Sequence, residues 1–321
     1  MPKVIFIADN HFCINSSVVN KRGEYFSDRL ENQISSIKWV DSFGLPVFHA
    51  GDFFDKPILT SEERSALDQV KDIVSKWTFL LGNHEYSGGF DQLGSLNGRY
   101  IRIPTEVDLY GLKTLFLPFN STEGDIKGRY DLIVGHLGLK DIPFGAKGLD
   151  FNIIDKSCEI FLNGHLHNRL KLGENKWNIG SLTSQNFSDD CLEYRKGIVI
   201  LDTDTKTLEF IENPYAFNFF KFKWGDFSKF TEEQKNSIVK ETSCLSISCL
   251  SGEKQEIMKS GIFDKVYYLR VSEELSSKKQ VEVNEKPIIE FDHLAKFRGA
   301  FISKVGESSV VLEELSEVLN G

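Results

Sequence analysis

The sequence predicts an α/β fold whose sheets are covered by helices, followed by a smaller α+β domain. In the first two-thirds of the chain, short β-rich apolar runs alternate with amphipathic stretches of helical periodicity. This alternation is typical of sheets packed against helices. After residue 213 it gives way to an aromatic-rich segment, and 321 residues exceed the usual size of one domain. We therefore predict two domains, over residues 1–212 and 213–321.

The strands of the first domain are predicted from short apolar runs bounded by turn residues. The run at residues 4–8 is apolar throughout, as expected of a strand buried on both faces. Short turns join the strands within 107–117 and within 198–211. In chain order, strands are expected at residues 4–8, 47–50, 78–81, 107–110, 114–117, 132–134, 160–162, 198–201 and 208–211.

Two helices are predicted among these strands. Residues 25–43 place apolar side chains close to every 3.6 positions, and Gly44 and Pro46 end the pattern. The second helix opens at Thr60 or Ser61, carries acidic residues in its first turn and runs to about residue 77.

The second domain is predicted to contain a helix near residues 231–241, strands near 244–249 and 266–271, and a terminal helix near 309–319. The terminal helix would group its Val and Leu residues on one face. Such a face suits a helix that binds a partner and suits equally a helix that caps its own domain. The sequence leaves both interpretations open.

The composition excludes several classes of protein. The chain holds 38 Lys and Arg against 47 Asp and Glu, a net charge of −9, so bulk positive charge cannot hold it on nucleic acid or on an anionic membrane. Its apolar runs are short and no signal-peptide pattern opens the chain, so we expect a cytoplasmic protein without a membrane partner. The five cysteines lack Cys-x-x-Cys spacing, which argues against disulfides and against a thiolate zinc site.

Five short polar motifs each follow a predicted strand. The carboxyl ends of strands in an α/β sheet converge, so these motifs are expected to meet. Each alone is also common in turns and helix caps, but five of the seven histidines lie in this ordered set. The motifs are Asp9-Asn10-His11, Gly51-Asp52-Phe53-Phe54-Asp55, Gly82-Asn83-His84-Glu85, Gly135-His136 and Gly164-His165-Leu166-His167.

The residue types in these motifs indicate a metal centre. Carboxylate, carboxamide and imidazole groups without thiolate suit Mn²⁺, Fe or Zn²⁺. Two ions about 3.5–4 Å apart lower the pKa of a shared water and offset the charge of an in-line attack on phosphate. Asp52 is the candidate bridging ligand, whereas His49 is expected to pack near the site without binding metal.

In their order, the motifs resemble those of the calcineurin-like metallophosphoesterase superfamily, whose pattern is D-x-H, G-D-x-x-D, G-N-H followed by Asp or Glu, G-H, and G-H-x-H. The resemblance implies a sandwich of two mixed β-sheets flanked by helices, plus a small C-terminal α+β capping domain. Within the superfamily the sequence is most similar to SbcD-type nucleases of the bacterial and phage branch, which act in DNA repair, recombination or replication. That closer likeness rests on residues 161–167, 178–182, 186–187 and 196–202.

The resemblance also implies roles for single residues. His84 would stabilise the charge of the transition state and protonate the leaving oxygen, without binding metal. The carboxylate of Asp55 would orient His84. One divalent ion would be held by Asp9, His11, Asp52 and His167, and a second by Asp52, Asn83, His136 and His165. Mn²⁺ is the ion expected first, with Mg²⁺, Fe or Zn²⁺ as alternatives.

The function favoured by the resemblance is that of a two-metal DNA nuclease acting on DNA ends or hairpins as an exonuclease, an endonuclease or both. The implied partners are DNA, an SbcC-type ABC ATPase, and a second copy of the chain bound through the phosphoesterase domain. Candidate phosphate contacts near the motifs are Lys21, Arg22, Arg169 and Lys171, each of which is also explained as a solvated surface charge.

Two alternatives stay open. One is a metallophosphoesterase for small substrates, such as cyclic nucleotides or phosphomonoesters, and the other is a non-catalytic subunit that binds DNA ends. Glu85 gives the G-N-H-E form that is commoner among protein phosphatases. Lys56-Pro57 stands where those phosphatases carry Arg-Gly to bind phosphate, which weighs against a protein phosphatase.

Overall fold

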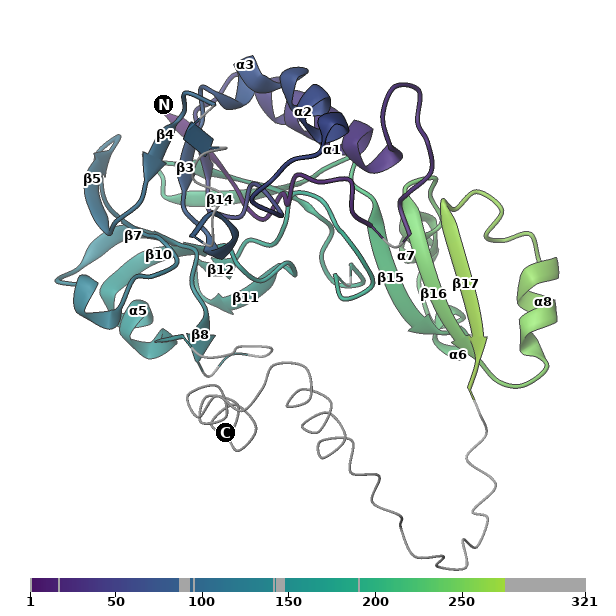
Figure 1. The fold of residues 1–321 in the computed structure, drawn as a ribbon. Helices are drawn as coiled ribbons and strands as arrows, with labels where there is room; N and C mark the ends of the chain where they lie inside the picture. Colours follow the sequence, from purple (N-terminus) through teal and green to yellow (C-terminus); the bar gives the residue numbers. More distant parts are fainter. Residues whose placement is uncertain are drawn as a thin grey trace, which may run out of the picture. The chain divides into compact units, whose positions relative to one another are not determined.

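Two six-stranded sheets pack face to face, and helices cover their outer faces (Figure 1). The computed structural model describes residues 2–16, 18–86, 93–94, 96–140, 142, 148–189 and 191–274. All of these lie within one compact unit, residues 1–275. The predicted α/β sandwich of two mixed sheets is therefore confirmed.

The first sheet combines a parallel half with an antiparallel edge. Its strand order is β14-β13-β1-β2-β3-β4. β1 to β4 are parallel, whereas β13 is antiparallel to both of its neighbours. Its strands are β1 (Lys3–Ile7), β2 (Val47–His49), β3 (Thr78–Leu80), β4 (Arg99–Ile101), β13 (Gly197–Asp202) and β14 (Thr207–Glu212).

The second sheet has a parallel centre and two antiparallel edges. Its strand order is β11-β12-β10-β7-β6-β5, and β12, β10, β7 and β6 run parallel. Its strands are β5 (Thr105–Leu109), β6 (Leu112–Leu117), β7 (Tyr130–Gly135), β10 (Cys158–Asn163), β11 (Leu170–Gly173) and β12 (Lys176–Asn178).

The packing of β1 explains why its sequence is apolar throughout. Ile5 and Ile7 belong to the core beneath the helices, whereas Val4 and Phe6 fill the core between the two sheets. A strand covered on both faces needs apolar residues at every position. The ends of such buried strands are therefore held in place by packing on two sides.

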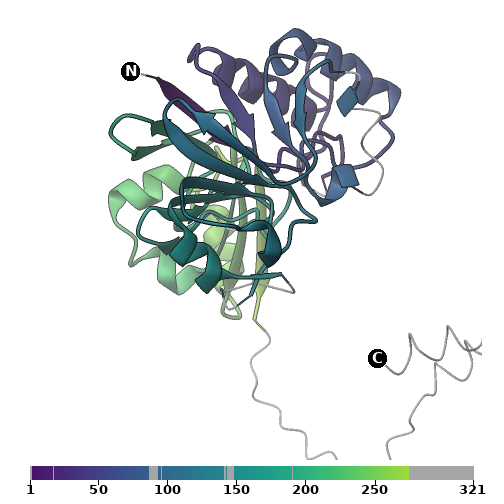
Figure 2. The ribbon, with the colours of Figure 1, turned by 90° about the vertical axis from the view of Figure 1, so that its left-hand side faces the viewer.

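Three helices cover the outer face of the first sheet (Figure 2): α1 (Asp28–Asp41), α2 (Ser61–Asp68) and α3 (Lys71–Val74). The Ser27 side chain caps α1, and Thr60 and Glu63 form a capping box at the start of α2. The single helix predicted to run to about residue 77 is wrong in its length, because the backbone leaves the helical region at Val70 (φ −129°, ψ 2°).

A short helix covers part of the outer face of the second sheet, and other short elements lie in its connecting loops. α5 (Phe151–Ser157) packs through Ile154 on a core that includes Ile133 and Phe161. The other short elements in this region are the 3₁₀ helix η2 (Glu123–Asp125) and the paired strands β8 (Leu139–Lys140) and β9 (Leu149–Asp150).

A third, three-stranded parallel sheet follows β14. Its strands are β15 (Asn218–Lys223), β16 (Ser243–Cys249) and β17 (Tyr268–Glu273), and its helices are α6 (Trp224–Phe227), α7 (Glu232–Ile238) and α8 (Glu253–Lys259). The predicted boundary at residues 212/213 falls between β14 and β15 and stays a prediction. The terminal helix predicted near 309–319 lies outside the described residues.

Candidate metal centre and active site

All five motifs lie directly after the carboxyl ends of parallel strands. Asp9 and His11 follow β1, Asp52 follows β2, and Asn83 with His84 follows β3. His136 follows β7, and His165 with His167 follows β10, so two motifs come from the second sheet. The expected convergence is observed, and both sheets contribute to it.

Hydrogen bonds join the two sets of strand ends. The carboxylate of Asp9 accepts from the backbone N–H of His165 at 3.1 Å. His136 Nδ1 lies 2.7 Å from the carbonyl oxygen of Ala50. Because a carbonyl only accepts, Nδ1 of His136 carries a proton, and the ring directs Nε2 toward Asp52 and Asn83.

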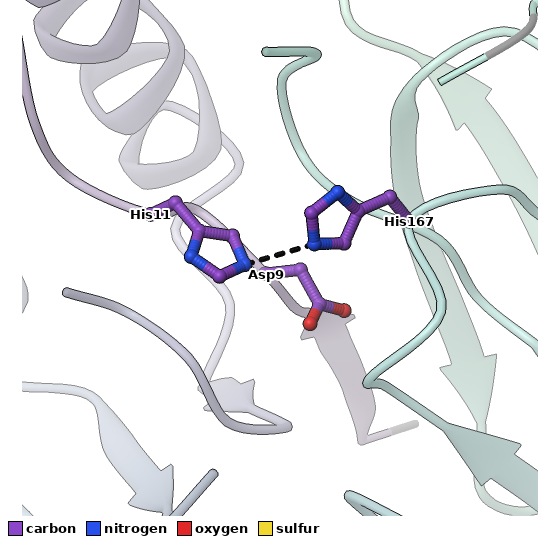
Figure 3. A group of neighbouring side chains, drawn as sticks. All are labelled: Asp9, His11 and His167. Atoms are coloured by element: carbon purple, nitrogen blue, oxygen red, sulfur yellow. Dashed lines mark hydrogen bonds between the residues drawn. The ribbon is translucent and has the colours of Figure 1, made fainter. Parts of the chain in front are cut away.

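Three overlapping groups of side chains could each hold a cation. They are Asp9, His11 and His167; His11, Asp52 and His84; and Asp52, His136 and His165. Within each group the donor atoms lie within 4.8 Å of one another. Figure 3 shows the first group, in which Nε2 of His11 and Nε2 of His167 are 2.9 Å apart.

Asn83 joins this cluster from β3. Its Oδ1 lies 3.1 Å from His136 Nε2 and 2.9 Å from His165 Nδ1. The structure thus brings together all seven residues predicted to bind metal. It also places His84, predicted not to bind metal, beside His11 and Asp52.

The chemistry of this donor set fits divalent cations. Carboxylate, carboxamide and imidazole atoms are ligands for borderline and hard ions. Two imidazole nitrogens facing each other, as in His11 and His167, are an arrangement that a cation can stabilise. When bound, such ions supply Lewis acidity toward phosphoryl oxygens and a water of lowered pKa.

The neighbours of Asp52 keep its carboxylate charged and therefore able to bind a cation. Burial alone would raise the pKa of this carboxyl, but His136 and His11 hold it well below its usual range. Burial likewise disfavours the charged form of His136, yet Asp52 raises the pKa of His136 to about 9. Asp52 is therefore an anion at neutral pH.

Four of the predicted ligands have left-handed backbone conformations. The φ angles are 51° at Asp9, 45° at His11, 57° at Asp52 and 78° at His165. Residues other than glycine rarely adopt such angles, and each costs free energy that the surrounding structure must offset. Backbone hydrogen bonds of 3.0 Å from Asp9 to Gly51 and from His11 to Asp52 hold two of these turns.

Glu85 is a structural anchor for the second and third motifs. Its buried carboxylate accepts from the backbone N–H groups of Asp52 (2.9 Å), Phe54 (3.1 Å) and Gly82 (2.9 Å). Burial, followed by the charge of Asp52, raises the pKa of Glu85 to about 7. The side chain at this position therefore fixes the two loops that carry Asp52, Asn83 and His84.

Two glycines permit the close packing of the ligands. Gly51 has φ +96°, and a Cβ there would overlap the ring of His136. A Cβ on Gly82 would overlap the carboxylate of Asp52. Lack of space therefore requires glycine at both positions, and at Gly51 the backbone conformation requires it as well.

Asp55 lies beside both His84 and His11, and its role in orienting His84 stays a prediction. Its backbone carbonyl oxygen lies 2.5 Å from His84 Nδ1. The carboxylate lies 3.3 Å from His11 Nδ1, and the hydrogen bond with His11 lowers the pKa of Asp55 to about 2.

Two supporting residues were not predicted from the sequence. The carboxylate of Asp189 lies 3.0 Å from His167 Nδ1, and Asn10 Oδ1 lies 3.0 Å from His49 Nε2. His49 is 1% exposed and belongs to none of the candidate groups among the described residues. Neither Asp189 nor Asn10 has a motif of its own, except that Asn10 stands between two predicted ligands.

The four basic residues near the motifs are engaged with other groups of the protein. Lys21 Nζ donates to the carbonyl of Tyr267 at 3.3 Å, and Arg22 pairs with Glu62 at 2.8 Å. The other two lie over aromatic rings, Arg169 over Tyr194 and Phe210 and Lys171 over Trp177. Their role as phosphate contacts stays a prediction.

Comparison with known proteins agrees with this geometry. The family model of the calcineurin-like phosphoesterases matches residues 2–182, which is more than half of the chain. The chain therefore belongs to this family. Together, the family and the clusters of His and Asp define a hydrolase, a metal-dependent phosphoesterase that uses divalent ions.

Two solved structures are similar to this chain at low sequence identity. A 5′-nucleotidase precursor from Thermus thermophilus has 11% identity and a TM-score of 0.34, with 65% of this chain and 53% of that chain covered. A calcineurin-like phosphoesterase from Bacillus subtilis has 12% identity and a TM-score of 0.31, with 66% and 88% covered. The chain thus spans about half the length of the nucleotidase precursor. No curated protein matches the sequence.

In the described parts of the chain, no helix has both the length and the apolar character needed to cross a bilayer.

Proposed function

We propose that the protein is a two-metal DNA nuclease of the SbcD type, which hydrolyses phosphodiester bonds at DNA ends or hairpins. One observation carries the proposal: the candidate groups form a continuous cluster in which Asp52 belongs to two of them. A carboxylate shared in this way suits a ligand that bridges two ions, and such a pair of ions can stabilise in-line attack on a phosphodiester. The mixture of carboxylate and imidazole donors makes Mn²⁺ the ion proposed first.

The segments that resemble SbcD-type nucleases support the same site. Asn178 Nδ2 donates to the carbonyl oxygens of Leu166 (2.6 Å) and Asn168 (2.8 Å). Lys196 Nζ donates to the carbonyl oxygen of His167 at 2.6 Å. These contacts fix the loop that carries His165 and His167, so the nuclease-like sequence surrounds that part of the proposed centre.

The remaining parts of the proposal follow from the sequence likeness alone. His84 is proposed to protonate the leaving oxygen, an SbcC-type ABC ATPase to be the partner, and a homodimer to form through the phosphoesterase domain. A cytoplasmic location is also proposed, as expected from the short apolar runs of the sequence. Since the chain has a net charge of −9, DNA affinity must come from the metal centre, from local contacts and from the partner rather than from bulk charge.

The test is cleavage of defined substrates by the purified chain. End-labelled duplex, hairpin and single-stranded DNA, and a phosphomonoester, are incubated with Mn²⁺ or with EDTA, with and without the ABC ATPase. We expect DNA cleavage with Mn²⁺ and none with EDTA. An Asp52→Asn variant prepared in the same way must be inactive, which excludes a contaminating nuclease. Hydrolysis of the monoester alone would overturn the nuclease proposal.

A further inference from the structure

A cavity of about 530 Å³ lies beside the metal centre, with His165 and His167 in its wall. This volume is within the range of roughly 300–1,000 Å³ that is typical of ligand sites. Much of the remaining wall is apolar, because Leu166, Leu170 and Tyr194 line it. The group that enters this cavity therefore adjoins a phosphate held at the metal centre and has an apolar or planar surface.

The charges around this cavity do not favour a second anionic group. Among the described residues that line it, Arg169 is the only cation. Its guanidinium lies 5.0 Å from the ring centre of Tyr194 and 4.9 Å from that of Phe210, so it is engaged by two rings. Asp189 and Glu193 add negative charge to the wall. A polyphosphate or an acidic phosphopeptide is therefore a poor fit.

The ring of Tyr194 is held in place by its neighbours. The guanidinium of Arg169 lies over it, and the ring of Trp177 meets it edge to face with 5.9 Å between centroids. An aromatic ring fixed in this way loses little conformational freedom when a second planar group stacks on it. Any of the nucleobases can stack on such a ring, because every base has a flat π-face.

We propose that this cavity is a nucleoside subsite. It receives the sugar and base attached to the phosphate at the metal centre, with Tyr194 stacking on the base and Arg169 positioning the Tyr194 ring. The inference rests on the proposed function and names the chemical class that this site accepts: a nucleotide unit rather than a phosphorylated peptide or a simple alkyl phosphate.

The first experiment compares two diesters that share one leaving group. Thymidine 5′-(p-nitrophenyl phosphate) carries a nucleoside, and methyl p-nitrophenyl phosphate does not. We expect Tyr194→Ala to raise KM for the thymidine ester about tenfold and to leave kcat/KM for the methyl ester unchanged. Tyr194→Phe, which keeps the ring, is expected to behave as the parent chain. Tyr215→Ala, at a tyrosine that is 46% exposed and outside the cavity lining, is the matched control.

The second experiment measures binding without metal or turnover. In EDTA, the affinities of thymidine monophosphate and of inorganic phosphate are compared by isothermal titration calorimetry. Tyr194→Ala is expected to weaken binding of the nucleotide about tenfold and to leave that of phosphate unchanged. An unfolding midpoint equal to that of the parent chain shows that the variant is folded.

The two proposals fail in different ways. If the parent chain does not bind thymidine monophosphate, or if Tyr194→Ala changes both esters equally, the nucleoside subsite is overturned even when DNA is cleaved. If DNA is not cleaved but the thymidine ester and thymidine monophosphate depend on Tyr194, the nuclease proposal fails and the subsite stands.

Discussion

The imidazole of His167 and the carboxylate of Asp189 form a hydrogen-bonded pair, with 3.0 Å between Nδ1 and Oδ1. The second carboxylate oxygen accepts from the backbone N–H of Gln185 at 2.7 Å, so Asp189 is fixed from both sides. Burial would raise the pKa of Asp189, but His167 holds it below its usual range. Because Nδ1 of His167 faces Asp189, its Nε2 is directed at His11 and the metal centre.

Replacing Asp189 with Asn should weaken metal binding. The amide has nearly the same shape but no charge, so it supports the orientation and basicity of His167 less well. We expect the Mn²⁺ affinity of Asp189→Asn to fall about 10–100-fold, as for other residues that support metal-binding histidines. Isothermal titration calorimetry measures this, with Asp204→Asn at an exposed turn as the control. An unchanged affinity would show that His167 does not depend on this pair.

Replacing His84 separates catalysis from metal binding. The Asp55 carbonyl lies against Nδ1 of His84, so Nε2 is the nitrogen proposed to transfer the proton. We expect His84→Gln to keep its Mn²⁺ affinity while kcat falls about 10²–10⁴-fold, the usual contribution of a general acid. Metal content and kcat are measured on the same preparation. Because His84 also lies beside His11 and Asp52, a parallel loss of metal would show that it is a ligand.

Two glycine variants distinguish backbone strain from crowding. Gly51 and Gly111 both have positive φ angles, +96° and +88°, but only Gly51 is crowded, because nothing lies within 4 Å of a Cβ on Gly111. Gly111→Ala should cost about 1–2 kcal/mol of unfolding free energy from backbone strain alone. Gly51→Ala should cost more and should also lose Mn²⁺ binding, since the His136 ring must move. Urea unfolding compares them, and equal losses would contradict the crowding argument.

The surroundings of Glu63, a residue away from the metal centre, imply that the stability of the fold depends on pH. Burial would raise the pKa of Glu63, but hydrogen bonds from the N–H groups of Ile14 (2.8 Å) and Thr60 (2.7 Å), and from Lys56, bring it below 4.5. In the unfolded chain the Glu63 carboxylate keeps its ordinary pKa of 4.5 and binds a proton more readily than in the folded protein. The stabilisation that the charged carboxylate provides is therefore present above pH 4.5 and is lost as the pH falls through the lower pKa of the folded state.

The matched variant isolates the contribution of that carboxylate. Glu63→Gln should lower the free energy of unfolding near neutral pH, and the difference from the parent chain should shrink in acid. Urea unfolding at about pH 7 and about pH 4 measures both. A difference that stays constant over this range would exclude ionisation of Glu63 as its cause.

The sequence predicted those strands whose burial imposes a pattern. Residues 4–8, 132–134 and 160–162 were recognisable because a strand packed on both faces is apolar at successive positions. β11 and β12 were missed, because they are short and are defined by their pairing with each other and with β10. Such pairing has no signature within so few residues.

The site was predictable where its residues are close in the sequence and unpredictable where they are not. The five motifs could be recognised, because each places donors within a few residues of a strand end. The pairing of His167 with Asp189 joins positions 22 apart along the chain, and only the folded loop brings them together. The contact of the Asp55 carbonyl with His84 Nδ1 was not predictable either, because a sequence does not show whether a backbone or a side-chain oxygen lies near a given ring.

The position of β1 also sets the order in which the metal centre can be completed. β1 pairs with β2 on one side and with β13 on the other. During synthesis Asp9 and His11 emerge early, but the partner strand at Gly197–Asp202 emerges only after every motif and Asp189 have been made. A chain released before that point leaves one edge of β1 without a partner. The hydrolytic centre is therefore supported on both sides only in chains whose synthesis has passed β13.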